Sequence, residues 1–497
     1  MPYILGIDLG TSSLKGLVLD KNGKVVGCAS AEYPLIQPKA GYNEQDPKEW
    51  VQACERVIES LAKEIPDFTG ELEGISFSGQ MHSLVVLNER NQILRNAILW
   101  NDVRTTAQCR EIMADFGEEL LQITKNKALE GFTLPKILWL QENEPEIWAK
   151  TRHILLPKDY LGFWLTGTQH MDASDAAGTL LLDIEKREWS EMILQKYHIA
   201  AGILPPLVPS SQLTGTVRED LAKHFGFKKE VQVFAGGADN ACAALGAGIV
   251  SQDCAMASIG TSGVFLSYEQ TTDTEYDGQL HFFCHAVDQA YYSMGVTLAA
   301  GRSLQWFRDT FASGQSFEEL LSGIEKIEPG AGGLLFTPYL SGERTPYADS
   351  QIRGSFIGMD TQHTMKHFVR AVVEGITFSL KDSQVLMEEV SDRRFSRIIS
   401  VGGGAKNKAW LQMQADIFDA EIVCLQAEQG PALGAAIIAA VGRNWFDSFE
   451  SACGSIVDYQ AAIYPAKENV EKYQKIYQRY REIYPATRGI CMEQENK

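Results

Sequence analysis

Apolar stretches that end in small polar residues open the chain. Residues 3–20 (YILGIDLGTSSLKGLVLD) consist of an apolar run, a Gly-Thr-Ser turn and a second apolar run. An Asn22-Gly23 turn and a third extended stretch, residues 24–33, follow. Apolar runs joined by short glycine-containing turns are typical of antiparallel hairpins, so the pattern predicts a strand meander.

The same pattern returns half a chain later. Residues 254–268 (CAMASIGTSGVFLSY) place a second small-residue turn, Gly260 to Gly263, between two apolar runs. A repeat of one supersecondary unit indicates duplicated domains, and 497 residues exceed the usual size of a single hydrophobic core. We therefore expect two domains, residues 1–247 and residues 248–497.

Helical periodicity follows the first meander. Asp46 and Pro47 are a typical N-cap and first-turn pair, and Glu49 stands in the capping-box position. Residues 72–79 then predict a strand, and residues 396–418 predict a strand, a glycine turn and a helix. Apolar residues at helical spacing predict packed faces at two places: Trp50, Cys54, Val57, Ile58 and Leu61, and later Tyr473, Ile476, Tyr477, Tyr480, Ile483 and Tyr484.

Composition narrows the class of protein. The formal net charge is −19 without a basic cluster, which disfavours nucleic acid and anionic membranes as partners. The nine cysteines form no Cys-x-x-Cys pair, so the sequence suggests neither a zinc site nor a redox motif. Scattered cysteines in odd number fit a reducing compartment. We see no signal peptide, and the longest near-apolar run, residues 431–441, is too short to span a bilayer. A cytoplasmic protein is expected.

Candidate chemistry begins at the first turn. Asp8 ends an apolar run and is followed by Gly10, Thr11 and Ser12, whose backbone N–H groups and hydroxyls can approach phosphate oxygens closely. The carboxylate can then hold Mg²⁺ beside the β- and γ-phosphates of a nucleotide. A hairpin turn with a solvated aspartate is the alternative. The second turn favours phosphate binding, because two opposed hairpins can clasp a polyphosphate.

Two better-known phosphate motifs do not account for this site. The Asp115-Phe116-Gly117 tripeptide lacks the His-Arg-Asp and Ala-Pro-Glu segments of protein kinases, and no Gly-Lys-Ser/Thr sequence provides a Walker A loop.

At these motifs the chain resembles the actin-like ATPases and, among them, the FGGY carbohydrate kinases. Residues 131–143 (GFTLPKILWLQEN) and 354–375 (GSFIGMDTQHTMKHFVRAVVEG) look like the two family signatures. The resemblance implies an α/β fold of two actin-like (ribonuclease H-like) ATPase domains with an interdomain cleft. The segments most similar to the xylulokinase branch are GYNEQDP (41–47), SGQMH (78–82), ILWNDVR (98–104), LLPKDYLGFWLTG (155–167) and PYLSGERTP (338–346).

The resemblance also implies roles on the sugar side. Asp239 matches the general base, and a helix-capping aspartate is the alternative reading. Gln80, Met81, His82 and Asn240 match the residues that hold a ketose, with His82 able to use either ring nitrogen. Glycerol kinases carry Arg-Glu where this chain has Gln80-Met81, which argues against glycerol. Trp100, Asn101 and Asp102 either touch the substrate or shape its pocket.

Nucleotide contacts are implied for the second half of the chain. The residues that match them are Gly260, Thr261, Gly301, Gly403, Gly404 and Asn407. Lys15, beyond the first turn, points either at ATP or into solvent.

The expected activity is therefore transfer of a phosphoryl group from ATP, with Mg²⁺, to D-xylulose. Another kinase of the family, acting on ribulose, erythritol or gluconate, is the nearest alternative. A non-enzymatic actin-like ATP switch is the more distant one. Expected partners are a small sugar and ATP, with no nucleic acid or membrane, and a homodimer is left open.

Overall fold

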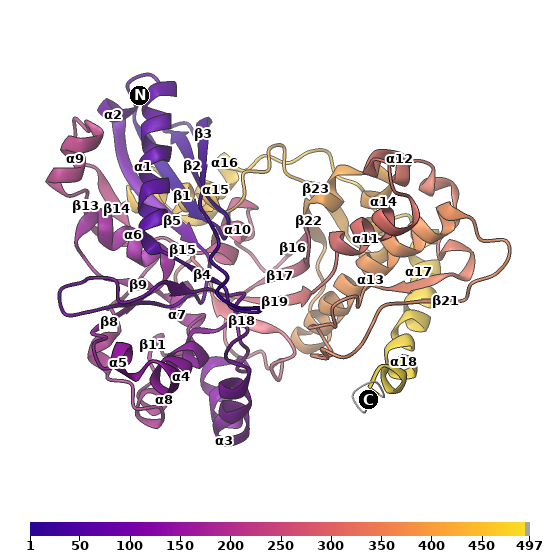
Figure 1. Ribbon diagram of the computed structural model, residues 1–497. Helices are drawn as coiled ribbons and strands as arrows, with labels where there is room; N and C mark the ends of the chain where they lie inside the picture. The colour runs from indigo at the N-terminus through magenta and orange to yellow at the C-terminus, as the bar shows by residue number, and fades with distance from the viewer. Residues whose placement is uncertain (493–497) are drawn as a thin grey trace.

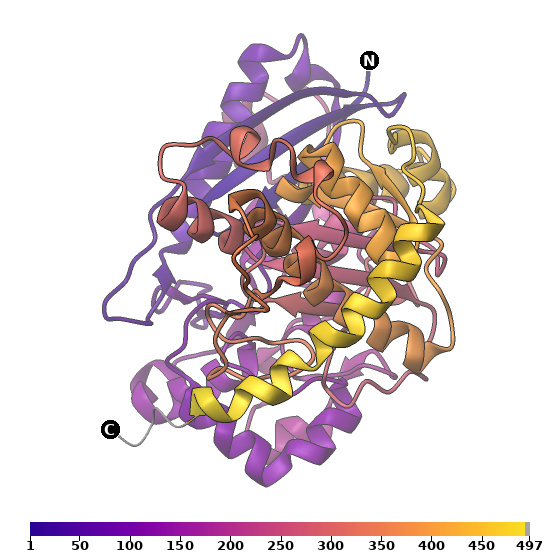
Figure 2. The ribbon, with the colours of Figure 1, turned by 90° about the vertical axis from the view of Figure 1, so that its right-hand side faces the viewer.

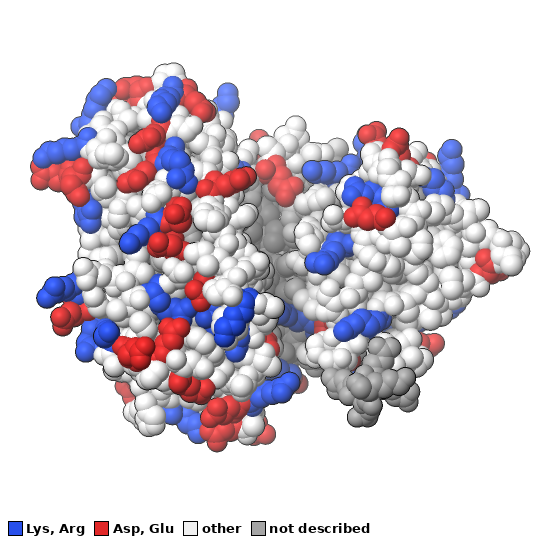
Figure 3. Space-filling view, in the orientation of Figure 1, with Lys and Arg blue, Asp and Glu red and all other residues white. Residues whose placement is uncertain are grey.

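Two lobes separated by a cleft make up the molecule, as seen in a computed structural model that describes residues 1–492. Each lobe is built on one mixed β-sheet, and Figure 3 shows the cleft as a deep groove between the lobes. Acidic and basic side chains are interspersed on that face.

The first sheet has the strand order β13-β14-β5-β1-β2-β3, with β15 paired to the end of β5. Strands β1, β2 and β3 form the predicted meander, and β5 pairs parallel to β1. The bounds are β1 Tyr3–Leu9, β2 Ser13–Asp20, β3 Val25–Glu32, β5 Leu72–Gly79, β13 Leu213–Thr216, β14 Gln232–Phe234 and β15 Gly237–Ala238.

The second sheet repeats this centre. Its order is β18-β19-β17-β16-β22-β23, in which β16 pairs antiparallel to β17 and parallel to β22. The predicted repeat is therefore a repeat of backbone topology. The bounds are β16 Cys254–Ile259, β17 Gly263–Glu269, β18 His281–Cys284, β19 Tyr291–Thr297, β22 Arg397–Gly402 and β23 Glu421–Cys424.

Alternation along β1 directs side chains to two different layers. Leu5, Ile7 and Leu9 pack in one cluster with the apolar stripe of helix α1 (Pro47–Glu64), which begins at the predicted N-cap Asp46. Ile4 packs on the other face, in the cluster that contains helix α15 (Pro431–Gly442). Successive side chains of a strand point to opposite faces, and those of β1 are apolar on both, so this sheet is covered on both faces.

Helix α15 belongs to the second half of the sequence but lies on the first sheet. It contacts β1 and β5 and crosses helix α10 (Asp239–Gly246) at close range. Figure 1 shows α15 and α16 (Phe449–Ile456) among the indigo and magenta elements of the N-terminal lobe. Gly6 allows this approach, since a Cβ atom there would lie 2.2 Å from the Ala432 carbonyl oxygen. The expected division near residue 247 falls between α10 and β16, yet the chain later returns to the first lobe.

The aromatic stripe near the C-terminus is a packed helix face, as expected. Tyr473, Tyr477 and Tyr480 are buried on α17 (Lys467–Arg481), where Phe378 of α13 (Met365–Ser391) packs against all three. Figure 2 shows α17 and α18 (Ile483–Met492) running as a yellow diagonal across the C-terminal lobe.

The remaining helices and strands complete the two lobes. The helices are α2 Phe68–Glu71, α3 Thr106–Thr124, α4 Thr133–Asn143, α5 Pro145–Trp148, α6 Pro157–Thr166, α7 Ala173–Ala177, α8 Glu191–Lys196, α9 Glu219–Phe225, α11 Gly301–Phe311, α12 Phe317–Leu321 and α14 Lys408–Phe418. The strands are β4 Glu44–Gln45, β6 Val85–Leu87, β7 Ala97–Ile98, β8 His153–Leu155, β9 Met171–Asp172, β10 Leu182–Asp183, β11 Glu188–Trp189, β12 Leu207–Val208, β20 Leu335–Thr337 and β21 Ser355–Ile357.

All nine cysteines lie within the described residues and are free thiols. Across residues 1–492, no helix combines the length and the apolar character that crossing a membrane requires.

Candidate active site

Two carboxylates meet because of the alternation along β1. Asp8 follows Ile4 and Gly6 at a spacing of two, so it faces the layer that contains α10 and α15. Asp239 is the first residue of α10. The short strand β15, which pairs with the end of β5, delivers that helix to the carboxyl end of β1. The fold therefore brings together residues that are far apart in the sequence.

Hydrogen bonds fix both the backbone just before Asp239 and its carboxylate. The Ala238 N–H donates to Ser174 Oγ at 2.9 Å. The Asp239 carboxylate accepts the Asn240 N–H at 2.7 Å and Asn240 Nδ2 at 3.0 Å. These bonds fix the orientation of the predicted base, Asp239, and Asn240 donates two hydrogen bonds to its carboxylate.

Both carboxylates have raised pKa values. Burial, and then the nearby charge of Asp8, raises the pKa of Asp239 to about 7. Burial raises the pKa of Asp8 to about 6, against the opposing effects of Ser78 and Lys15. A carboxylate with a pKa near the working pH can accept a proton and later release it, which suits a general base.

The first turn is tied to the wall of the cleft. The Gly10 N–H closes it on Ser13 O at 3.0 Å. Thr11 Oγ1 accepts from the indole nitrogen of Trp100 at 2.9 Å, and its carbonyl accepts from Gln45 Nε2 at 2.6 Å. The predicted phosphate contacts Gly10, Thr11 and Ser12 therefore lie beside the residues 100–102.

Lys15 bonds to a segment far along the chain. It stands opposite Asp8 in the β1–β2 register, and its ammonium donates to Gln429 O at 2.9 Å and to Gln429 Oε1 at 3.2 Å. Gln429 comes shortly before α15, so this lysine joins the first hairpin to the returning helix.

A cavity of about 330 Å³ adjoins Asp239 and has walls from both lobes. Its volume falls in the range of sites for small molecules. The first lobe contributes the predicted residues Met81, His82, Asp239 and Asn240. The lining from the second lobe, which the sequence did not reveal, includes Ser262, Val264, His281, Phe283, Met294, Val296 and Arg344.

Met81 and His82 are fixed at this cavity by polar contacts. Met81 Sδ accepts from Asn240 Nδ2 at 3.6 Å. His82 Nδ1 lies 2.6 Å from the Gly178 carbonyl oxygen, which can only accept, so this nitrogen carries the proton. Burial, and then the charge of Lys136, lowers the pKa of His82 to about 3. The neutral ring therefore offers a substrate only Nε2, as an acceptor, rather than either nitrogen as expected.

Gln80 departs from its expected role. Its side chain is buried and donates to Gln45 Oε1 at 3.1 Å and to the Gly10 carbonyl at 3.5 Å. Gln45 in turn binds the carbonyl of Thr11. Gln80 thus supports the phosphate turn: it directly follows β5, and its amide points to the end of β1 rather than into the sugar cavity.

Residues 100–102 have different contacts and therefore different roles. Trp100 is 44% exposed, lines the cavity and binds Thr11. Asn101 also lines it. Asp102 forms an ion pair with Arg104 at 2.7 Å and accepts the Asn43 N–H at 2.6 Å. Asp102 shapes the wall, whereas Trp100 links the sugar side to the phosphate turn.

The nucleotide candidates gather at a second cavity, of about 670 Å³, in the C-terminal lobe. The predicted residues that line it are Gly260, Thr261, Gly301, Gly403, Gly404 and Asn407. Arg302, Phe317 and Lys406 also line it and were not anticipated. A cation at a phosphate site and an aromatic ring beside a purine are both favourable, so these residues join the candidate set.

Two of these residues have structural duties as well. A Cβ atom on Gly301 would lie 2.4 Å from the Gly260 carbonyl oxygen, so glycine is required where α11 meets the second turn. Asn407 is the N-cap of α14 and accepts the Trp410 N–H at 3.0 Å.

A buried charge cluster that the sequence did not predict supports the backbone before Asp239. Lys158 Nζ lies 2.5, 2.9 and 3.2 Å from carboxylate oxygens of Asp159, Asp172 and Asp175. The three acids are close enough to hold a metal ion, but the lysine ammonium is their cation. Asp172 also accepts from Ser174, the residue whose hydroxyl binds Ala238. The cluster thereby anchors the backbone just before the base.

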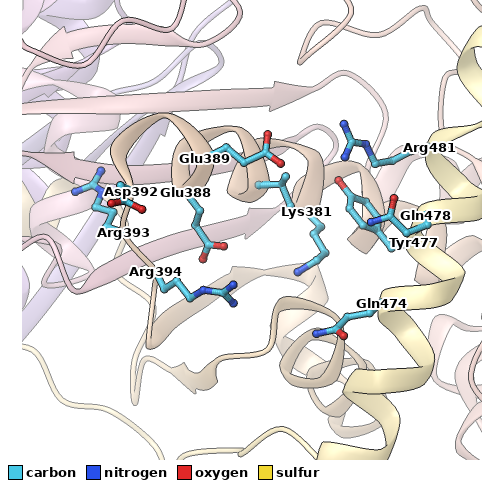
Figure 4. Close-up of a pocket in the computed structure, with 11 residues that line it drawn as sticks. Lys381, Glu388, Glu389, Asp392, Arg393, Arg394, Gln474, Tyr477, Gln478 and Arg481 are labelled. Carbon is cyan, nitrogen blue, oxygen red and sulfur yellow. The ribbon is translucent and has the colours of Figure 1, made fainter.

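A further cavity, of about 540 Å³, lies away from the cleft between α13 and α17 (Figure 4). Its walls mix basic and acidic groups and include no predicted site residue. The lining is Lys381, Val385, Glu388, Glu389, Asp392, Arg393, Arg394, Gln474, Tyr477, Gln478 and Arg481.

Known proteins share this architecture over the whole chain. A xylulose kinase from Lactococcus lactis subsp. lactis is 56% identical over 491 residues, which cover 99% of this chain and 98% of the relative. A ligand-bound xylulose kinase from Lactobacillus acidophilus superposes with a TM-score of 0.94 at 27% identity, covering 99% of this chain and 100% of its own. A gluconate kinase from the same organism superposes with a TM-score of 0.93 at 28% identity, covering 98% of each chain.

The sequence also matches both halves of one family of enzymes. Residues 3–246 match the N-terminal domain and residues 255–443 the C-terminal domain of the FGGY family of carbohydrate kinases. These likenesses confirm the expected fold of two α/β domains of the actin-like ATPase type. The chain belongs to the FGGY family of carbohydrate kinases.

Proposed function

We propose that this kinase transfers the γ-phosphoryl group of ATP to the C5 hydroxyl of D-xylulose. The observation that carries the proposal is Asp239, oriented at the sugar cavity with a pKa of about 7, next to the phosphate turn that follows Asp8. The substrate is suggested by the relative from Lactococcus lactis, named a xylulose kinase. The gluconate kinase with the same fold shows that the fold alone does not choose the sugar.

Asp239 acts as the general base. A sugar hydroxyl is a weak nucleophile, and a carboxylate hydrogen-bonded to it removes its proton as the C5 oxygen forms the bond to γ-phosphorus. The bond from γ-phosphorus to the bridging oxygen breaks, and ADP leaves. The proton on Asp239 then passes to solvent, which a pKa of about 7 allows at neutral pH.

Binding groups on the two sides of the cleft hold the reactants. Met81, His82 and Asn240 contact the ketose, while Thr11 and Thr261, from the two opposed turns, contact phosphate oxygens. The glycines of the nucleotide cavity let the adenosine and α-phosphate pass close to the backbone.

The donor set near Asp8 fits Mg²⁺. Carboxylate, hydroxyl and water oxygens are the ligands this ion prefers, and Asp8 with Thr11 and Ser12 offers them at one strand end. When bound, the ion neutralises charge on the β- and γ-phosphates.

A sugar panel tests the proposal. ADP formation is measured with D-xylulose, D-ribulose, erythritol, D-gluconate and glycerol, and the product carbon is identified by ³¹P–¹H correlation. We expect D-xylulose to give the highest kcat/KM and a 5-phosphate. A higher kcat/KM with another acceptor would assign the enzyme to a sister activity. ATP turnover that ignores every sugar would support an ATP switch.

We further propose a cytoplasmic enzyme that needs neither nucleic acid nor a membrane. A homodimer stays a prediction, which light scattering of the purified protein will test.

A further inference from the structure

Arg344 reaches the sugar cavity from the lobe opposite the base. It follows Glu343 in the segment 338–346 and lines the cavity together with His82 and His281. Within residues 1–492, it is the one lysine or arginine in that lining. The sequence marked this segment as similar to xylulokinases without giving Arg344 a role.

The backbone on both sides of Arg344 is fastened down. Glu343 is buried, and its Oε1 accepts the Leu298 N–H at 3.0 Å while Oε2 accepts from Ser379 at 3.1 Å. The Thr345 N–H donates to Val296 O at 3.1 Å, and Thr345 Oγ1 accepts the Val296 N–H at 3.0 Å. These contacts join the segment to β19 and α13. They leave the Arg344 side chain as the part that projects to the cavity.

The Arg344 guanidinium has no hydrogen-bond or ion-pair partner in the part of the chain that the structure describes. Two other secluded arginines differ sharply. Arg104 pairs with Asp102 and Glu44, and Arg370 with Glu374 and Tyr473. Burial lowers the pKa of Arg344. Glu130, which also lines the cavity, acts on Arg344 through its charge but forms no hydrogen bond to it, so the guanidinium keeps up to five N–H donors for a ligand.

Its neighbours in the cavity supply acceptors and no positive charge. His281 Nδ1 lies 3.3 Å from Asn126 Oδ1, which also accepts the Phe282 N–H, so Nδ1 is the donor. Like His82, His281 then faces the cavity with Nε2 as an acceptor. Burial, followed by the charge of Arg344, lowers the pKa of His281 well below its ordinary value.

His82 and His281 pack in one cluster with Phe132 and Phe283, and Arg344 lines the same cavity as these two histidines. Its charge acts on His82 and His281, whereas the charge that acts on Asp239 is that of Asp8. A substrate whose C5 hydroxyl meets Asp239 therefore directs its C1–C2 end toward Arg344 and the two histidines.

The chemistry of a 2-ketopentose matches this arrangement. Its furanose ring uses the C5 oxygen, so only the open-chain form has a free C5 hydroxyl to phosphorylate. That form also exposes the C2 carbonyl, which can only accept hydrogen bonds. Arg344 can only donate, and the histidine acceptors suit the neighbouring C1 hydroxyl.

We propose that Arg344 determines specificity by donating hydrogen bonds to the C2 carbonyl of the open-chain ketose, across the cleft from the base. This rests on the proposed phosphorylation at C5. A polyol carries at C2 a hydroxyl that is a weaker acceptor for a guanidinium, so the contact separates ketoses from polyols of the same length.

The test compares D-xylulose with xylitol and D-arabinitol, which carry a hydroxyl in place of the carbonyl. For Arg344→Met we expect kcat/KM for D-xylulose to fall about 10- to 100-fold, as for loss of a charged hydrogen bond. The polyol kcat/KM and the KM for ATP should change less than about 3-fold, so the preference for the ketose shrinks. Arg344→Lys should give an intermediate loss, because it keeps a charge but not the planar donor pair.

Arg353→Gln is the matched control, because Arg353 lies nine residues further along the chain, is exposed and donates only to the Ser350 and Ile352 carbonyls. It should leave all kinetic constants unchanged, and melting curves will show that each variant is folded. If Arg344→Met does not fold, the Lys variant decides by the same ratio. Unchanged selectivity, or equal losses on ketose and polyol, overturns the role of Arg344. Failure of the wild type to phosphorylate D-xylulose overturns the proposed function itself.

Discussion

The two Gly-Thr-Ser turns occupy the same place in their sheets, but they differ in chemistry and by one residue in the bond that closes them, Gly10 to Ser13 and Gly260 to Ser262. Each follows the central strand of a sheet, and each is closed by a glycine N–H on a serine carbonyl at 3.0 Å. Asp8 precedes the first glycine by two residues, and Ser258 holds that place before the second. The two lobes therefore hold two similar turns that we propose to bind phosphate, of which the first alone has a carboxylate at that position.

Their surroundings differ as well. Thr11 is bound by Trp100 from the wall of the sugar cavity, whereas the carbonyl of Thr261 accepts the N–H groups of Ala300 and Arg302 at the start of α11. The first turn is thus coupled to the sugar, and the second to the nucleotide cavity. Catalysis should be far more sensitive to changes in the first lobe than to matching changes in the second.

The largest effect is expected at Asp239. Asp239→Asn removes the base while keeping its shape, so kcat should fall about 10²- to 10⁴-fold, with sugar affinity nearly unchanged. Steady-state assays measure kcat, and isothermal titration calorimetry measures the affinity for D-xylulose. Exposed Asp288, on the other lobe, provides the control Asp288→Asn, which should behave as wild type. Turnover close to normal in Asp239→Asn would rule out its role as base.

The paired changes Asp8→Asn and Ser258→Ala test the asymmetry of the turns directly. Loss of the Asp8 charge should lower kcat about 10²- to 10³-fold, as for other groups that stabilise transferring phosphate. Ser258→Ala should change it less than about 2-fold. Steady-state rates over a Mg²⁺ titration measure both. Equal losses in the two variants would contradict the asymmetry.

The pH dependence follows from the raised pKa of Asp239. Its carboxyl is protonated below about pH 7, so kcat/KM should fall about tenfold per pH unit on the acid side, with Asp8 adding a steeper loss below about pH 6. Because folding raises this pKa from its ordinary value of 3.8 to about 7, the folded state loses stability as pH rises from about 4 to about 7. Asp239→Asn should therefore melt at a higher temperature than wild type at pH 8, by a margin that becomes smaller toward pH 5. A flat activity profile from pH 5 to 8 would argue against this base.

The smallest effects should come from the two threonines. Thr261→Val should raise the KM for ATP about 10-fold, as expected for one hydrogen bond to a charged group, with the KM for sugar unchanged. Thr11→Val should raise both constants, because Trp100 also loses its acceptor. Initial rates with each substrate varied in turn will distinguish the patterns. If Thr261→Val changed the KM for sugar but Thr11→Val did not, the coupling of the first turn to the sugar and of the second to the nucleotide would be reversed.

Local patterns predicted the local structure well. The meander of residues 3–32, the cap at Asp46 and the tyrosine face of α17 all follow from periodicity and turn residues near one another in sequence. The family motifs placed Met81, His82, Asp239 and Asn240 at one cavity and the glycines at another.

Contacts between distant segments could not be predicted in this way. Arg344, His281 and the cluster around Lys158 reach the site through tertiary packing, to which no periodicity in their own segments points. Gln80 shows the converse, since it belongs to a family motif but its amide, just after β5, points to the phosphate turn. The tautomer of His82 likewise depends on the Gly178 carbonyl, 96 residues away in the sequence.

The return of α15 to the first sheet has a consequence for synthesis on the ribosome. The N-terminal meander is made first, but one face of its sheet stays uncovered until the chain beyond residue 442 has been released. At about 5–20 residues per second, that wait lasts on the order of tens of seconds. We therefore expect that the first lobe does not fold on its own. A truncation at residue 247 should expose the apolar face that α15 covers and aggregate, whereas adding residues 431–442 as a separate peptide should suppress that aggregation.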